Sequence, residues 1–184
     1  PTVVSGDREL RYELGRSPME RLERSGVEKQ TLHVQYRMPP ALVEFPSKHF
    51  YRGVVQSSDS VLRRVVPRGF VWPVGGLPLA FLDVNGTETK HETGFSNAPE
   101  ADLVVDVVSD FLRKEEGTVV VLSPYAKQVS RVRTALRRAG VEGVRVGSVD
   151  SFQGQEADIV VFSATRSNQE GSLGFVRDAR RLNV

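Results

Sequence analysis

The chain of 184 residues contains no cysteine. Disulfide bonds, thiolate zinc sites, iron–sulfur clusters and cysteine nucleophiles are therefore excluded. A chain without disulfides is typical of a reducing compartment, so we expect an intracellular protein, cytoplasmic or nuclear. The sequence also lacks any run near the roughly 18 consecutive apolar residues that span a membrane, and it opens without a basic leader and apolar core. We therefore expect no membrane association.

Histidine is scarce, and the three residues are dispersed along the chain. A Ser-His-Asp triad or a histidine-rich metal site is therefore not expected. No glycine-rich loop ending in Gly-Lys-Ser/Thr is present. Because such a loop holds the phosphates in ATP-hydrolysing domains of the usual kind, we expect the chain alone not to hydrolyse ATP. A metabolic α/β enzyme is also disfavoured, since the chain has no cofactor fingerprint.

The chain as a whole has little excess charge, with a formal net charge of +2. Its distribution is uneven, because residues 88–116 carry five more acidic than basic side chains, whereas residues 126–146 carry five more basic than acidic ones. A basic stretch of this kind, with Arg131 and Arg138 on one expected helix, suits a phosphate-rich partner. A helix face in contact with water would have the same composition.

The length and the 39% of hydrophobic residues predict one domain over residues 1–184 with one core. Strands are expected over 31–35, 79–84, 118–122, 144–149 and 158–163, helices over 18–25, 40–51, 97–112 and 125–139, and an irregular connection over 52–78. The continuous apolar runs at 118–122 and 158–163 predict strands that are covered on both faces. This order predicts an α/β fold with a mostly parallel sheet flanked by helices.

Polar clusters follow three of the expected strands, over Gln35–Met38, Ser123–Gln128 and Ser148–Asp158. Ligands of open parallel sheets collect at the carboxyl ends of the strands, so these loops are the candidate site. Arg37 can present a rigid fork to phosphate oxygens, and Tyr36 offers a ring on which a base could stack. The alternative is a structural arginine that pairs with a surface carboxylate.

In this order the clusters resemble the second RecA-like domain of superfamily 1 helicases, which has the P-loop NTPase fold. They are most similar to the branch with the up-frameshift RNA helicase of nonsense-mediated decay, senataxin and the immunoglobulin mu-binding helicase. The resemblance rests on residues 32–53, 119–128, 146–168 and 171–184. It implies that the chain is a fragment, lacking its own phosphate loop, the first RecA-like domain upstream and the Thr-Arg of the last motif downstream.

The resemblance implies that Arg37 is catalytic and reaches the γ-phosphate of ATP as an arginine finger. Tyr36 would stack on the adenine and Glu156 would contact the ribose or γ-phosphate region. The implied ATP-binding residues are Gln35, Tyr36, Gln153, Gly154 and Glu156. Gln155 is a departure, because the family commonly has a basic residue there. The cofactor is ATP with Mg²⁺, and the metal would be held by the missing first domain.

For nucleic acid, the resemblance implies contacts along single-stranded RNA or DNA by the loops that follow the strands. The implied residues are Ser123, Pro124, Tyr125, Val149, Asp150, Thr165 and Arg166. Tyr125 could equally be a packed aromatic residue at a helix start. Arg180 and Arg181 would position the missing arginine of the last motif.

The implied partners are single-stranded nucleic acid and the first RecA-like domain of the same chain, in a monomer. The function implied is therefore the C-terminal motor domain of an ATP-dependent RNA or DNA helicase. The alternative is a catalytically inactive RecA-like module that either binds nucleic acid or has a regulatory role.

Overall fold

The computed structural model describes residues 7, 14–114 and 117–177. The chain divides into two compact units, Pro1–His33 and Val34–Val184. In the first unit, α2 (Pro18–Arg24) begins as predicted, since Ser17 Oγ accepts a hydrogen bond from the Glu20 N–H at 3.1 Å. None of the described residues of this unit is buried. The single core expected over residues 1–184 is therefore built, in the described part of the chain, by the second unit alone.

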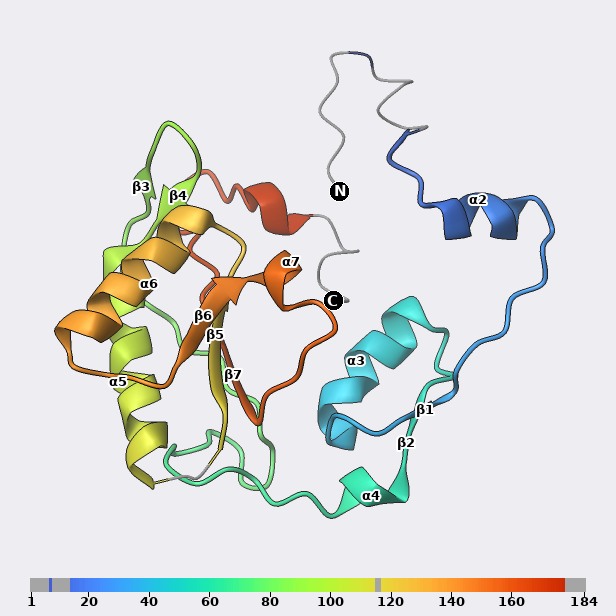
Figure 1. Cartoon of the computed structure of the whole chain (residues 1–184), viewed down its shortest axis with the longest axis horizontal. Coiled ribbons are helices and arrows are strands. Elements are labelled where there is room, and N and C mark those ends of the chain that lie inside the picture. Colours follow the sequence, from blue (N-terminus) through green and yellow to red (C-terminus); the bar gives the residue numbers. More distant parts are fainter. Residues whose placement is uncertain (1–6, 8–13, 115–116, 178–184) are drawn as a thin grey trace. The chain divides into compact units, whose positions relative to one another are not determined.

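The second unit contains a three-stranded parallel sheet with the strand order β6-β5-β7 (Figure 1). Its strands are β5 (Val119–Ser123), β6 (Arg145–Ser148) and β7 (Ile159–Phe162). Val121 of the central strand lies opposite Val146 on one side and Val161 on the other. The strands predicted over 118–122, 144–149 and 158–163 are confirmed, and so is their parallel arrangement.

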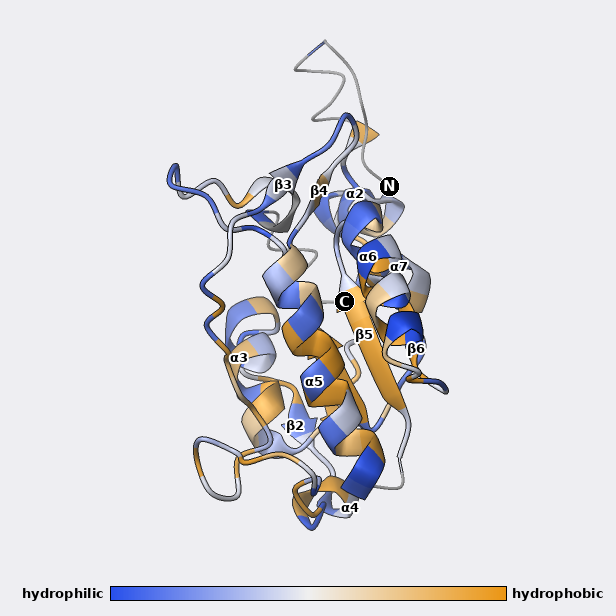
Figure 2. Cartoon of the chain, turned by 90° about the vertical axis from the view of Figure 1, so that its left-hand side faces the viewer, coloured by the Kyte–Doolittle hydropathy of each residue, from blue (hydrophilic) through white to orange (hydrophobic). Residues whose placement is uncertain are grey.

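Two long helices, α5 (Ala98–Lys114) and α6 (Ala126–Arg138), pack against each other and against this sheet. Figure 2 shows β5 as hydrophobic along its length and α5 as a mixture of hydrophobic and hydrophilic positions. The core cluster consists of Ala101, Val104, Val108 and Phe111 of α5, Val132 and Leu136 of α6, and Val119, Val121 and Ile159 of the sheet. Both helices start near their predicted positions because apolar residues recur at helical spacing.

The prediction that β7 is covered on both faces is wrong. Ile159 is buried, but Val160 is 53% exposed and Phe162 is 48% exposed. Alternate residues of a strand point to opposite faces, and the core cluster contacts the face of Val119, Val121 and Ile159. Because β7 is also an edge strand among the described residues, its second face lacks the cover that the central strand receives.

The strand predicted over residues 79–84 is also wrong, because this segment has no strand pairing. Leu79 is 56% exposed and Phe81 is 89% exposed. A strand requires a neighbour that pairs with its backbone N–H and C=O groups, and local apolar character does not supply one. The segment therefore runs as an irregular connection.

The predicted strand over 31–35 is reduced to β1 (Val34–Gln35), which pairs in parallel with β2 (Gln56–Ser57). Between them lies α3 (Pro40–Phe50), as predicted. The connection over 52–78 is not wholly irregular, because it contains β2 and the short helix α4 (Asp59–Leu62). Val61 of α4 is only 1% exposed, and this burial explains why the segment is ordered locally.

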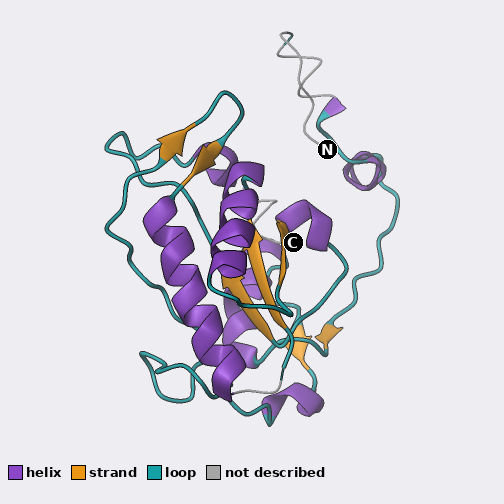
Figure 3. Ribbon diagram, turned by 60° about the vertical axis from the view of Figure 1, so that its left-hand side comes forward, coloured by secondary structure: helices purple, strands orange, loops and turns teal. Residues whose placement is uncertain are grey.

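A short antiparallel hairpin, β3 (Thr89–Lys90) and β4 (Phe95–Ser96), directly precedes α5 and contacts α6 (Figure 3). After β6 the chain forms the one-turn helix α7 (Val149–Phe152), and after β7 it reaches the 3₁₀ helix η1 (Gly174–Arg177). These elements surround the carboxyl ends of the strands, where the candidate loops lie. Arg180 and Arg181 lie outside the described residues.

Candidate functional site

The Gln35 side chain organises the turn that follows β1. Its Oε1 accepts hydrogen bonds from the backbone N–H groups of Arg37 and Met38, both at 2.8 Å. Its Nε2 donates to the Met38 carbonyl at 2.6 Å and to Ser57 Oγ of β2 at 2.7 Å. These contacts use both hydrogens and both acceptor positions of the amide. Gln35, predicted to bind ATP, therefore shapes the turn that presents Tyr36 and Arg37.

Arg37 and Glu156 meet although they lie 119 positions apart in the sequence. Arg37 Nε donates to Glu156 Oε2 at 3.2 Å, and the two side chains are 55% and 73% exposed. An exposed ion pair of this kind contributes little stability, so both groups can exchange it for a ligand. The structure thus brings together two predicted ATP-site residues. The same contact also matches the alternative prediction, that Arg37 pairs with a surface carboxylate.

The other predicted ATP-binding positions are accessible. Tyr36 is 65% exposed, and Gln153 and Gly154 are exposed in the loop after α7. Gly154 has a φ of +80° and an added Cβ would meet nothing within 4 Å, so the backbone conformation rather than space favours glycine. Gln155 Oε1 accepts from Arg145 Nη1 at 2.9 Å, and its Nε2 donates to the Ser151 carbonyl at 3.1 Å. Gln155, which departs from the family pattern, therefore supports the loop that carries Glu156.

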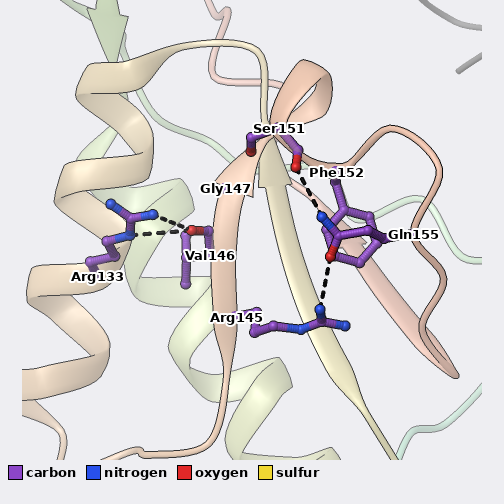
Figure 4. A pocket seen from close by; sticks show the side chains of 7 residues that line it. All are labelled: Arg133, Arg145, Val146, Gly147, Ser151, Phe152 and Gln155. Carbon is purple, nitrogen blue, oxygen red and sulfur yellow. Dashed lines mark hydrogen bonds between the residues drawn. The ribbon is translucent and has the colours of Figure 1, made fainter.

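An open pocket of about 360 Å³ lies beside β6 (Figure 4). Arg145 lies over the Phe152 ring with its Cζ 5.0 Å from the centroid. Arg133 of α6 donates to the Val146 carbonyl from Nε at 3.2 Å and from Nη2 at 2.5 Å. None of the predicted site residues lines this pocket. Its side chains hold α6, β6 and the Gln155 loop together, and Arg145 Nη2 also donates to the Glu156 carbonyl at 3.5 Å, so the pocket adjoins the loop that carries Glu156.

The residues predicted to contact nucleic acid after β5 and β7 form a buried polar cluster. Ser123 Oγ lies 3.0 Å from Thr165 Oγ1, and the two residues are 1% and 0% exposed. Tyr125, 8% exposed, donates from its backbone N–H to Ser123 Oγ at 3.3 Å. These side chains hold the two loops together and are covered. Tyr125 thus matches its alternative prediction, a packed aromatic residue at a helix start.

Thr165 has a φ of 72°, which is rare for a β-branched residue. Its backbone N–H donates to Glu100 Oε2 at 2.8 Å, and this bond holds the conformation. Burial raises the pKa of the Glu100 carboxyl, although hydrogen bonds from the 163–165 segment oppose the shift. A carboxylate of α5 therefore fixes the loop after β7.

Arg166 is predicted to contact nucleic acid, but its guanidinium is buried against Glu88. Nε donates to Glu88 Oε2 at 2.8 Å and Nη2 donates to Oε1 at 3.1 Å, with side chains only 8% and 11% exposed. The Arg166 Cζ also lies 4.1 Å from the Phe95 ring centroid. The hydrogen bonds from Arg166 hold the pKa of Glu88 below its ordinary value. Arg166 therefore anchors the β3–β4 hairpin to the loop after β7.

Three predicted nucleic-acid residues keep accessible surface at the ends of β5 and β6. Asp150 of α7 is exposed, and Val149 and Pro124 are half-buried. The Ser148 side chain caps α7 by accepting from the Ser151 N–H at 3.2 Å. These positions remain candidates for contact with a strand laid across the loops.

Sequence reasoning missed Glu88 and Arg64. Arg64 donates from Nη1 to the Arg37 carbonyl at 2.6 Å, across 27 residues of sequence. Glu88 pairs with Arg166 across 78 residues. Neither position carries a local signal, because each gains its role only from a partner far away in the chain.

Over residues 7, 14–114 and 117–177, no group of three His, Cys, Asp or Glu side chains is placed to hold a metal ion. In the same part of the chain, no helix combines the length and apolar character that crossing a membrane requires.

The chain is similar to known proteins over most of its length. The family described as "AAA domain" matches residues 14–184. The chain is 37% identical to "Regulator of nonsense transcripts 1 homolog" of Arabidopsis thaliana, over 99% of the chain and 15% of that relative. It is 36% identical to "ATP-dependent helicase NAM7" of Saccharomyces cerevisiae, over 93% of the chain and 19% of the relative.

A third relative, "Probable helicase MAGATAMA 3" of Arabidopsis thaliana, is 31% identical over 92% of the chain and 22% of its own length. The chain therefore spans less than a quarter of each of these three relatives. The parallel sheet flanked by helices agrees with the RecA-like fold expected from the sequence. The chain belongs to the AAA domain family, in the branch of superfamily 1 helicases that contains the regulators of nonsense transcripts.

Proposed function

We propose that this chain is the second RecA-like motor domain of an ATP-dependent RNA or DNA helicase, and that it supplies Arg37 to ATP hydrolysis. The observation that carries the proposal is an exposed arginine on a turn fixed by Gln35, with its guanidinium beside Glu156. The name of the yeast relative, an ATP-dependent helicase, supports this activity. The first RecA-like domain of the same chain would complete the ATP site, and the protein would act as a monomer inside the cell, in the cytoplasm or nucleus.

The chemistry follows from the exposed groups. When the two domains close on ATP, Arg37 exchanges Glu156 for the γ-phosphate oxygens and stabilises the negative charge of the transition state. Tyr36 offers its exposed ring to the adenine, and Gln153 and Glu156 offer polar groups to the ribose. Bound Mg²⁺ would neutralise phosphate charge and would be held by the first domain. The chain alone would then lack the groups that hydrolysis requires.

Single-stranded nucleic acid would lie across the loops at the carboxyl ends of β5, β6 and β7. Asp150, Val149 and Pro124 have accessible surface there. The buried residues Ser123, Thr165 and Arg166 would act by shaping these loops. Contacts to the phosphate–sugar backbone are sequence-tolerant and sensitive to salt.

Replacement of Arg37 tests the proposal in the complete protein that contains this chain. Arg37→Ala is expected to lower RNA-stimulated ATP turnover by about 10³-fold, by analogy with other arginine fingers, while the affinity for single-stranded RNA stays near that of the wild type. Arg37→Lys keeps the charge but loses the planar fork, so its turnover should lie between the two.

The exposed Arg63→Ala serves as the matched control and should leave turnover unchanged. An unaltered turnover in Arg37→Ala would refute the proposed role of Arg37. A parallel loss of turnover and RNA affinity would indicate a structural arginine. A complete protein that binds RNA but hydrolyses no ATP would support the alternative, an inactive RecA-like module.

A further inference from the structure

Arg64 is bound to the backbone of the turn that presents Arg37. Its Nη1 donates to the Arg37 carbonyl at 2.6 Å, and its Nη2 donates to the Tyr36 carbonyl at 3.4 Å. One planar guanidinium thus contacts two consecutive peptide groups. Two donors in a fixed fork restrain the orientation of both peptides, which a single flexible donor cannot do.

The segment that carries Arg64 is itself fixed to the same turn. The Ser58 N–H donates to the Gln35 carbonyl at 2.9 Å, and Ser57 Oγ accepts from Gln35 Nε2 at 2.7 Å. Val61 of α4 is 1% exposed, and the Arg64 N–H donates back to its carbonyl at 3.4 Å. The Arg64 backbone is therefore held in place by a buried residue and by β2.

The charge of Arg64 also has a small effect on Asp158, the residue before β7. Hydrogen bonds from Thr118 are the main cause of the lowered pKa of the Asp158 carboxyl, and the positive charge of Arg64 adds to it. The side-chain hydrogen bonds of Arg64 themselves go to the Arg37 turn.

We infer that Arg64 is a positioning residue for ATP hydrolysis, which sets the direction in which Arg37 leaves its turn. The inference rests on the proposed function of Arg37. Without Arg64, Gln35 still closes the turn from the N–H side. The carbonyls of Tyr36 and Arg37 lose their only side-chain donors among the hydrogen bonds of the described residues. A displacement of about 1 Å at a catalytic group can cost about 10²-fold in rate.

The test is Arg64→Met in the complete protein, which keeps the length of the side chain and removes its donors. We expect kcat for ATP to fall about 10-fold to 100-fold while KM changes little, because the ATP-binding groups themselves remain. Arg64→Lys keeps the charge and can reach one carbonyl, so its kcat should be intermediate. Arg63→Met, an equal change of charge on the preceding exposed residue, should match the wild type.

A double variant separates positioning from other effects. In an Arg37→Ala background, Arg64→Met should cause no further loss of kcat, because Arg64 acts through Arg37. The same further loss as in the wild type would overturn the inference, and so would a normal kcat in Arg64→Met. If Arg64→Met does not fold, Arg64→Lys decides, since wild-type kcat in that folded variant would refute the need for two donors. If Arg37→Ala itself leaves hydrolysis intact, the proposed function fails separately.

Discussion

The side chain of Gln128 pairs with the backbone of Asn97 as a neighbouring strand would. Its Oε1 accepts from the Asn97 N–H at 2.8 Å, and its Nε2 donates to the Asn97 carbonyl at 3.1 Å. The same Nε2 donates to Ser163 Oγ at 3.0 Å. Gln128 is 0% exposed, so one buried amide of α6 joins the residue before α5 to the residue after β7.

Replacement of this amide should be strongly destabilising. Gln128→Leu keeps a similar volume but leaves the buried N–H of Asn97 without its acceptor, at about 1–3 kcal/mol, while the Asn97 carbonyl keeps the Ala101 N–H as a donor at 3.2 Å. We expect the free energy of unfolding, measured by urea denaturation, to fall by about 1–3 kcal/mol. Lys127→Leu, on the exposed neighbouring position, is the control and should change little. A loss below about 1 kcal/mol would mean that water replaces the amide.

Replacing Glu100 and replacing Glu88 should change the free energy of unfolding with opposite dependence on pH. Burial raises the pKa of the Glu100 carboxyl. The stability that this carboxyl contributes is therefore present at a pH below its ordinary pKa of about 4.3, and it is lost as the pH rises through the raised pKa. Glu100→Gln keeps an acceptor for the Thr165 N–H. This variant should be at least as stable as the wild type at about pH 7, and its advantage should shrink toward about pH 4.

Glu88 is the matched opposite case. Hydrogen bonds from Arg166 lower its pKa, so its contribution is present above the ordinary value and is lost as pH falls through the lowered one. Glu88→Gln should be less stable than the wild type at neutral pH, and the difference in their free energies of unfolding should become smaller in acid. Urea denaturation of the two variants across this range measures both trends. If both variants changed in stability relative to the wild type in the same direction with pH, the opposite pKa shifts of Glu100 and Glu88 would be contradicted.

The exposed arginines of α6 are expected to bind phosphates. Arg131 Nε donates to Ser96 Oγ at 3.2 Å, so Arg138 at the exposed end of the helix is the cleaner probe. In the complete protein, Arg138→Glu should weaken binding of single-stranded RNA, and the slope of log Kobs against log salt should fall by about 0.7 for each phosphate that is no longer neutralised. Lys114→Glu, at the last residue of α5, makes the same change of charge on the neighbouring helix. An unchanged slope in Arg138→Glu would favour the alternative, a helix face that contacts only water.

The sheet and the two long helices could be predicted because their signals are local. Residues 118–122 form a continuous apolar run, and α5 and α6 carry apolar residues at helical spacing. The segment 79–84 has an equally apolar pattern but no pairing partner in the described part of the chain. Pairing is a property of two segments, so a pattern read within one of them cannot establish it.

The candidate site shows the same division. Arg37, Tyr36 and Glu156 carry recognisable motifs, and the structure leaves their side chains exposed. Ser123, Thr165 and Arg166 also lie in recognised motifs, but burial gives them partners that a motif does not reveal. Arg64 and Glu88 could not be found, since their contacts depend on how distant segments come together.

The contact between Arg133 and the Val146 carbonyl has a consequence for association between molecules. β6 is an edge strand of the described sheet, and an edge strand offers its backbone groups to strands of other chains. Two N–H groups of Arg133 already occupy the carbonyl of Val146. A strand of another molecule could pair with β6 at this carbonyl only by displacing the Arg133 guanidinium. The contact therefore opposes edge-to-edge aggregation through β6.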